Sequence, residues 1–330
     1  MLLSIRNSPY RQENISNMAT VDRRSFLQLA GTTLVGAALP SAALPASSGI
    51  PRLGLVVKVG KGGTPEETIK HVHDLGIPTC QIFFDELNMA QVKPLLAALK
   101  KYDVQVSAVS EHNPGPRVFD FDHGPGTIGI VPPAYRRQRL DQLKLAADFA
   151  NACGIDAIHT HLGFIPEDPT DPLYATAVTS IREVAEHCKP KGVMLLAETG
   201  EETPITLLRA ILDVGTGNFF VNLDTANLIL YGKGNPVDAM DVFGKYVRGT
   251  HMKDGVFPTN PHKLGEEVPI GKGRVDFPEL FRRFKAVNYS RTITIEREIS
   301  GPQQIADIRA SKTYLQQLID QNYASHEIRR

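Results

Sequence analysis

Short apolar runs and longer helical segments alternate along the chain from residue 52 onward. Each short run is rich in β-branched and other apolar residues, which is typical of buried strands. In the longer segments apolar residues recur about every 3.6 positions, which predicts helices that pack one face on a core. The runs predict eight strands, at 53–59, 79–84, 104–109, 157–162, 193–197, 219–223, 247–251 and 292–296.

The starts of several helical segments carry capping signals. Thr64-Pro65-Glu66-Glu67 combines an N-cap residue, a proline in the first turn and acids near the helix start. The longest helical segments run over 133–152 and 302–320. A similar start signal occurs at three later places: Asp171-Pro172, Thr203-Pro204 and Asp276-Phe277-Pro278-Glu279.

Strands that alternate with helices predict an α/β fold with a parallel sheet. Eight such units in about 270 residues favour closure into a single (β/α)8 TIM barrel over an open, doubly wound sheet. An open sheet that binds a dinucleotide would have a glycine-rich turn after its first strand. Gly60-Lys61-Gly62-Gly63 stands at that place, but the Thr64-Pro65 pair after it indicates a helix cap instead.

The first 48 residues differ from the rest. Arg23 and Arg24 precede Ser25-Phe26-Leu27, a weakly apolar run over 29–39 and then small residues at 41–43. This order resembles a twin-arginine export signal. We therefore predict a signal peptide and linker at 1–48, a barrel at 49–330, and an exported protein in the periplasm or outside the cell. A chance basic pair before a helix and an uncleaved amphipathic anchor are the alternatives.

Composition narrows the function classes. Lys and Arg together number 36, as do Asp and Glu, so the net charge is zero. A nucleic-acid binder or an anionic-membrane binder would carry a basic excess. The run at 29–39 is shorter than the roughly 20 residues of a membrane span, and no other segment qualifies. The three scattered cysteines form neither a disulfide framework nor a zinc-ribbon spacing.

Four consecutive predicted strands end in a residue that can bind a metal. Glu198 follows the fifth strand, Asp224 the sixth, His251 ends the seventh and Glu296 ends the eighth. Active sites of TIM barrels lie at the carboxyl ends of the strands, and an acid there without a partner is costly. Three carboxylates and an imidazole suit one divalent ion, Mn²⁺, Mg²⁺ or Co²⁺, with Zn²⁺ also compatible. The alternative is that each residue caps its strand or pairs with a lysine.

The segments around these four residues resemble the xylose isomerase-like TIM-barrel superfamily. This group of sugar phosphate isomerases and epimerases includes ketose 3-epimerases and inosose dehydratases. The likeness covers about residues 52–318, includes the loop 269–277, and is specific for the superfamily rather than for one substrate. It rests on Ala-Glu-Thr-Gly at 197–200, Leu-Asp-Thr-Ala-Asn-Leu at 223–228, Thr-His-Met-Lys-Asp-Gly at 250–255 and Ile-Glu-Arg-Glu at 295–298.

The resemblance implies a mechanism. In ketose epimerases of this group the metal binds two neighbouring sugar oxygens, and two glutamates exchange a proton with carbon through a cis-enediolate. Carried over, Glu198 and Glu296 are the catalytic pair, and Asp224 and His251 are pure ligands. Epimerases often have a histidine three residues after the aspartate, where this chain has Asn227. An amide is no proton donor–acceptor of that kind, which puts a strict epimerase assignment in doubt.

Further residues are candidates for substrate contact. His159 and His161 share one face of the fourth strand, and Lys253 lies two residues after His251. Asn227 can bind a hydroxyl. Glu111 and its neighbour His112 follow the third strand. Glu298 is an alternative ligand to Glu296, which we prefer because it directly follows the apolar run.

The sequence thus predicts a metal-dependent isomerase or epimerase that acts on a sugar or sugar derivative. A lyase or dehydratase in the same fold is the close alternative, because an enediolate beside a leaving hydroxyl can eliminate water. A non-catalytic sugar-binding barrel is the alternative of another class. An abasic-site nuclease would need more histidines and a basic groove. We expect a small carbohydrate as partner, no nucleic acid and no stable membrane span after processing. The sequence leaves a homo-oligomer open.

Overall fold

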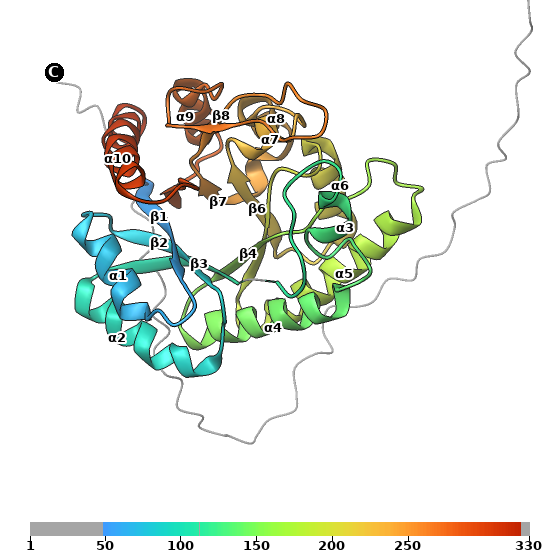
Figure 1. Cartoon of the computed structure of the whole chain (residues 1–330), viewed down its shortest axis with the longest axis horizontal. Helices are drawn as coiled ribbons and strands as arrows, with labels where there is room; N and C mark the ends of the chain where they lie inside the picture. The colour runs from blue at the N-terminus through green and yellow to red at the C-terminus, as the bar shows by residue number, and fades with distance from the viewer. Residues whose placement is uncertain (1–48, 112, 325–330) are drawn as a thin grey trace, which may run out of the picture. The chain divides into compact units, whose positions relative to one another are not determined.

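Eight parallel strands form one sheet in the order β10-β1-β2-β3-β4-β5-β6-β7, with helices around it (Figure 1). The computed structural model describes residues 49–111 and 113–324. The predicted TIM barrel is confirmed, whereas the predicted export signal at 1–48 lies outside the described residues and stays a prediction. The strands are β1 (Arg52–Val59), β2 (Thr79–Phe84), β3 (Gln105–Glu111), β4 (Ala157–His161), β5 (Met194–Glu198), β6 (Phe219–Asp224), β7 (Val247–His251) and β10 (Thr292–Ile295).

The last junction of the barrel, between β7 and β10, brings two candidate ligands together. β10 pairs with β1 along its length, but it meets β7 only just beyond the end of that strand, at the bridge between Met252 and Ile295. There the N–H of Met252 donates to Thr294 O at 2.6 Å, and the N–H of Glu296 donates to Met252 O at 3.1 Å. The junction therefore fixes the backbone of Glu296 beside that of His251.

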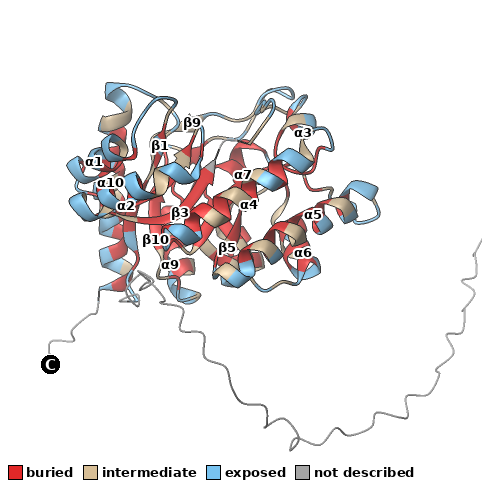
Figure 2. Ribbon diagram, turned by 90° about the horizontal axis from the view of Figure 1, so that it is seen from below, coloured by how far each residue is buried: buried red, intermediate tan, exposed pale blue. Residues whose placement is uncertain are grey.

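The helices bury one face each against the strands, whose side chains are almost all buried (Figure 2). No helix within the described ranges combines the length and apolar character that a bilayer crossing requires. The longer helices are α1 (Pro65–Asp74), α2 (Val92–Tyr102), α4 (Arg136–Ala152), α5 (Pro172–Cys188), α6 (Pro204–Val214), α8 (Pro236–Phe243), α9 (Phe277–Ala286) and α10 (Pro302–Tyr323). The short elements are α3 (Gly124–Thr127), α7 (Asn227–Leu230), η1 (Met89–Gln91), η2 (Lys189–Lys191), η3 (Gly244–Tyr246) and the β8 (Asp254–Gly255) and β9 (Glu267–Val268) pair.

Three of the four predicted helix caps form. Thr64 and Glu67 make a reciprocal capping box, and the carboxylates of Asp171 and Asp276 accept backbone N–H groups at the starts of α5 and α9. Thr203 makes no such cap, because its hydroxyl donates to Glu167 Oε2 at 2.7 Å instead. The same glutamate accepts the N–H of Thr203 at 3.0 Å, so a residue from the loop between β4 and α5 satisfies this helix start.

A buried arginine forms hydrogen bonds with the long connection between β3 and α4. Arg139 of α4 is 0% exposed and donates to the carbonyl oxygens of Pro114 at 2.9 Å, of Pro116 at 3.0 Å and of Gly129. These carbonyls belong to the loop that borders the mouth of the barrel, so Arg139 fixes the loop's shape.

We expect Arg139→Met to lower the free energy of unfolding by about 2–5 kcal/mol, because the buried carbonyl of Gly129 and the less buried carbonyls of Pro114 and Pro116 then lose their donor. Chemical denaturation measures the change. Arg137→Met is the matched control: the Arg137 side chain is 56% exposed and pairs with Asp141 and Glu183, and such surface pairs contribute little to stability. Equal losses in the two variants would contradict the anchoring role.

Candidate metal centre

Glu198, Asp224, His251 and Glu296 meet at the carboxyl ends of β5, β6, β7 and β10. One ligand atom from each lies within 4.8 Å of all the others. The four residues are 3%, 0%, 0% and 8% exposed, so the cluster is buried. The structure thus brings together the four side chains that the sequence placed at neighbouring strand ends.

His251 presents its Nδ1 atom to the three carboxylates. Nδ1 lies 3.0 Å from Glu198 Oε1, 3.3 Å from Glu296 Oε2 and 3.9 Å from Asp224 Oδ2. Burial lowers the pKa of His251, but Glu296 and Glu198 outweigh it and raise this pKa well above the usual value. Without a cation the imidazole therefore carries a proton that screens the carboxylates from one another.

Asp224 is oriented by the chain that follows it. Its Oδ1 accepts the N–H groups of Ala226 at 2.8 Å and Asn227 at 2.7 Å, which leaves Oδ2 to face the cluster. Burial raises the pKa of Asp224 to about 8, although the nearby Lys253 ammonium opposes this shift. Asn227 therefore supports the centre through its backbone.

Lys253 is a buried cation beside the cluster. It is 1% exposed, and its Nζ lies 3.1 Å from Asp224 Oδ2 and 3.3 Å from both Glu296 Oε2 and Glu298 Oε2. Burial lowers the pKa of Lys253, but the carboxylates, Asp224 first, raise it well above the usual value. Glu298 is 59% exposed and reaches Lys253 rather than the cluster.

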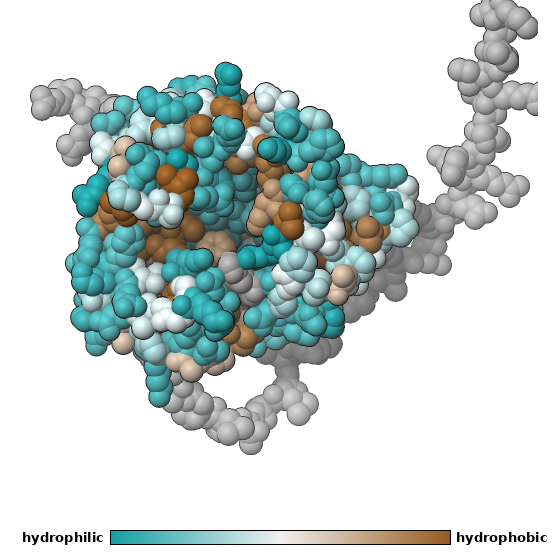
Figure 3. Space-filling model, viewed as in Figure 1, coloured by the Kyte–Doolittle hydropathy of each residue, from teal (hydrophilic) through white to brown (hydrophobic). Residues whose placement is uncertain are grey.

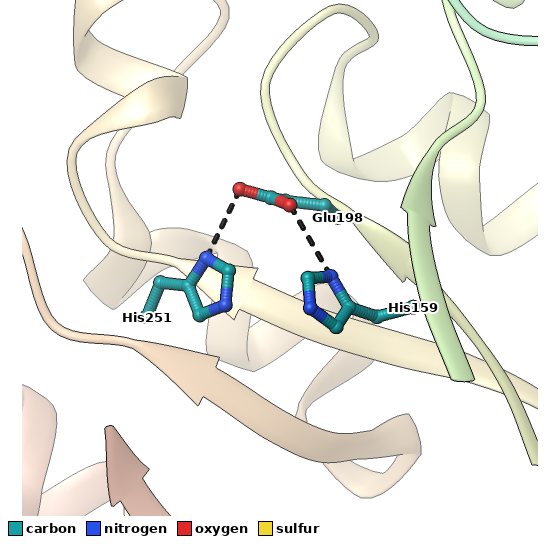
Figure 4. Close-up of side chains that lie close together, drawn as sticks. All are labelled: His159, Glu198 and His251. Carbon is teal, nitrogen blue, oxygen red and sulfur yellow. Dashed lines mark hydrogen bonds and ion pairs between the residues drawn. The ribbon is translucent and has the colours of Figure 1, made fainter. Parts of the chain in front are cut away.

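Two imidazoles flank the carboxylate of Glu198, as Figure 4 shows. His251 approaches Oε1, and Nδ1 of the buried His159 lies 3.5 Å from Oε2. His161 Nε2 lies 3.4 Å from Oε1. Burial raises the pKa of Glu198, but His161 and His251 outweigh it and hold this pKa well below the usual range. A metal ion would thus find Glu198 as a carboxylate.

Glu201 is a site residue that the sequence analysis missed. It is 1% exposed, and its Oε1 lies 2.8 Å from His161 Nδ1. His161 therefore lies between two carboxylates, with Nδ1 toward Glu201 and Nε2 toward Glu198. Burial lowers the pKa of His161, but Glu198 and Glu201 raise it to about 10. The signal available in the sequence is that Glu201 follows Glu198 by three residues, across Gly200.

Gln81 is a second residue that was missed. It lies in the middle of β2, is 0% exposed and contacts His251 from across the barrel interior, with Oε1 2.9 Å from Nε2. An amide between Cys80 and Ile82, inside an otherwise apolar run, is the signal that marks it.

A pocket opens from the centre toward the loop above β3 and β4. Its empty volume is about 330 Å³ with the open mouth included. Figure 3 shows the hollowed face, with hydrophilic and hydrophobic residues around the hollow. Glu111 ends β3, but its side chain and all of His112 lie outside the described part of the chain. The pocket walls include Phe83, Asn113, Arg117, Phe119, His161 and Glu198.

The loop 269–277 wraps a buried carboxylate next to the centre. Asp254 is 1% exposed and accepts backbone N–H groups of Gly255 at 2.9 Å, Gly271 at 2.9 Å, Gly273 at 2.8 Å and Val275 at 3.1 Å. A Cβ atom on Gly273 would lie 2.2 Å from Asp254 Oδ1, so this close approach requires glycine. The glycines of this motif therefore fix the chain directly after Lys253.

The donors present fit a divalent ion. Asp224 Oδ2 and Glu296 Oε2 are buried and accept no hydrogen bond from any described residue. Buried carboxylate oxygens in this state are costly unless positive charge neutralises them, and without a metal that charge comes from Lys253 and the protonated His251. The set of three carboxylates and one imidazole is typical of Mn²⁺, Mg²⁺ and related ions. The cluster could therefore hold one metal.

The family of this chain follows from its sequence and its fold together. The family described as Xylose isomerase-like TIM barrel matches residues 69–318, and the protein belongs to it. No curated protein matches the chain.

Several solved structures are similar. A xylose isomerase domain protein from Planctomyces limnophilus is 29% identical, with a TM-score of 0.78 over 84% of this chain and 100% of its own. An L-ribulose 3-epimerase is 16% identical, with a TM-score of 0.64 over 84% and 99%. A Xylose isomerase-like TIM barrel protein from Mycobacterium smegmatis in complex with magnesium is 18% identical, with a TM-score of 0.61 over 78% and 89%. The last two likenesses show the fold alone.

Proposed function

We propose that this protein is a divalent-metal-dependent isomerase or epimerase that acts on a sugar or sugar derivative. The observation that supports this best is the buried convergence of Glu198, Asp224, His251 and Glu296 at the active end of the barrel. The similar structures include an L-ribulose 3-epimerase and a protein in complex with magnesium, which agree with a sugar substrate and a metal.

The four residues would hold Mn²⁺, Mg²⁺ or Co²⁺, with Zn²⁺ as a further candidate. Such an ion, when bound, stabilises negative charge on substrate oxygens next to the carbon that loses a proton. The pocket beside Glu198 is the proposed way in for the substrate, because it opens to solvent and its lining includes Glu198 and His161.

Glu198 and Glu296 are the proposed proton-transfer pair. They project from β5 and from the end of β10, with Asp224 and His251 on the strands between them. Burial raises the pKa of each, but His251 together with His161 or Lys253 outweighs burial and lowers both. Each glutamate is therefore ionised, as a group that takes a proton from carbon must be. One would remove the proton from one face of the substrate and the other would return it from the opposite face.

A lyase is the second candidate, and His161 is the observation that favours it. Its imidazole borders the pocket, touches Glu198 at 3.4 Å and is backed by Glu201 at 2.8 Å. A carboxylate–imidazole pair of this kind can give a proton to a departing hydroxyl. Asn227, which stands where many ketose epimerases have a histidine, cannot do so.

Turnover in deuterium oxide distinguishes the two reactions. Metal-loaded protein is incubated with free monosaccharides, keto-sugars and inositols, and the products are analysed by mass spectrometry and NMR. We expect an isomer or epimer that carries one solvent deuterium on carbon. Loss of water with a new unsaturated ketone would identify a lyase. Binding without any turnover, in a protein shown to hold its metal, would identify a non-catalytic sugar-binding barrel.

A further inference from the structure

Gln81 and His251 are in contact although their strands, β2 and β7, are not neighbours in the sheet. β2 and β7 are separated by β1 and β10 around the barrel, so the Gln81 side chain crosses the interior. Its Oε1 lies 2.9 Å from His251 Nε2. Its Nε2 donates to Asn222 Oδ1 at 3.0 Å and faces the backbone oxygen of Thr250 at 3.4 Å. Gln81 and Asn222 are both 0% exposed.

These contacts leave one orientation for the Gln81 amide. The oxygen of Thr250 can only accept, so the amide group that faces it is the NH₂. The carbonyl oxygen of Gln81 must then face His251 and accept a hydrogen bond from Nε2–H. A neutral imidazole with its proton on Nε2 has a lone pair on Nδ1 that can bind a metal ion. Nδ1 is the atom that faces Glu198, Asp224 and Glu296.

Asn222, which accepts a hydrogen bond from Gln81, fits only because the residue next to it is a glycine. Asn222 of β6 lies over Gly249 of β7, where a Cβ atom would come within 2.3 Å of Asn222 Oδ1. Only glycine leaves this space. The network of His251, Gln81 and Asn222 therefore depends on residues from three strands, β2, β6 and β7.

We propose that Gln81 is a positioning residue for the metal centre, which holds His251 so that Nδ1 faces the bound ion. This rests on the proposed function, since it assigns a role toward the ion that the four ligands would bind. The contact is a hydrogen bond from the non-ligating ring nitrogen to an amide oxygen, the usual way in which a protein fixes a metal-binding histidine.

The test compares Mn²⁺ binding by calorimetry to metal-free wild-type protein, Gln81→Met and Gln81→Glu. Methionine fills similar space and accepts no comparable hydrogen bond, so we expect about 10–100-fold weaker binding. The variant still unfolds cooperatively, at a lower melting temperature, because His251 Nε2–H and Asn222 Oδ1 lose a buried partner. Glutamate restores an acceptor for Nε2–H, and Asn222 can turn its amide to donate to it, but a carboxylate oxygen then faces the backbone oxygen of Thr250, so binding recovers in part. Gln105→Met, on the neighbouring strand β3 where Gln105 pairs with Arg52, is the matched control and keeps wild-type binding.

A second measurement is independent of the metal. In metal-free protein, the hydrogen-bonded Nε2 proton of His251 gives a downfield NMR signal, assigned by its loss in His251→Gln and separated from the Nδ1 proton that faces Glu198 by its coupling to the Nε2 nitrogen. We expect Gln81→Met to lose this signal and Gln81→Glu to keep it. Equal Mn²⁺ binding in wild type and Gln81→Met, or a signal that survives in Gln81→Met, overturns the role of Gln81. If wild type binds no divalent ion, the proposed function fails, and the NMR signal alone decides about Gln81.

Discussion

Glu198→Gln and Glu296→Gln each lower the turnover number by about a hundredfold to ten-thousandfold, the usual contribution of a general acid or base. The amide keeps the size of the side chain but cannot take a proton from carbon. Both side chains are buried beside His251 in the proposed metal centre, so each substitution also weakens the binding of the metal. Steady-state kinetics on the substrate found by the deuterium screen measures the effect, with Mn²⁺ supplied well above the dissociation constant of each variant.

Glu298→Gln is the matched control for this prediction. Glu298 lies two residues after Glu296, is 59% exposed and contacts Lys253 at 3.3 Å without joining the four-residue cluster. We expect its turnover number to stay within about threefold of wild type, because a partly solvated charge pair contributes little. A large loss in Glu298→Gln with normal turnover in Glu296→Gln would reverse the assignment of the two glutamates.

The sequence places the four clustered residues together because each stands at the end of a predicted strand. Glu198 and Asp224 are the last residues of β5 and β6, and parallel strands of a barrel bring such ends to one rim. Lys253 could also be placed, since it follows His251 by two residues and so points to the same side. These inferences need only strand periodicity and the direction of the chain.

The supporting residues could not be predicted in the same way. Gln81 meets His251 across 170 positions of sequence, and the contact exists only because the barrel closes. Glu201 lies in a turn after Gly200, where no periodic pattern indicates which side chain is buried. Thr203 carries a capping signal, but its hydroxyl donates a hydrogen bond to Glu167 instead. The residues around Thr203 do not indicate this contact, because Glu167 lies in another loop.

The affinity for Mn²⁺ rises with pH, from about pH 6 to about pH 8, because protons and the metal compete for the same atoms. Burial raises the pKa of Asp224 to about 8. Burial lowers the pKa of His251, but Glu296 and Glu198 raise it well above its ordinary value. At neutral pH the metal-free centre therefore holds protons on both groups, and an ion that binds Asp224 and His251 Nδ1 must displace them.

The direction and size of this effect follow from linkage. Each proton displaced weakens apparent binding by about tenfold per pH unit below the pKa of the group that holds it, so the loss on acidification reaches about a hundredfold per unit where both groups are protonated. Calorimetric titration at each pH, in two buffers of different ionisation enthalpy, gives both the affinity and the number of protons released. Asp224→Asn should bind Mn²⁺ more weakly at every pH and release fewer protons, because one titrating ligand is gone. Binding that is independent of pH, with no proton released by wild type, would show that the ion does not bind through Asp224 and His251.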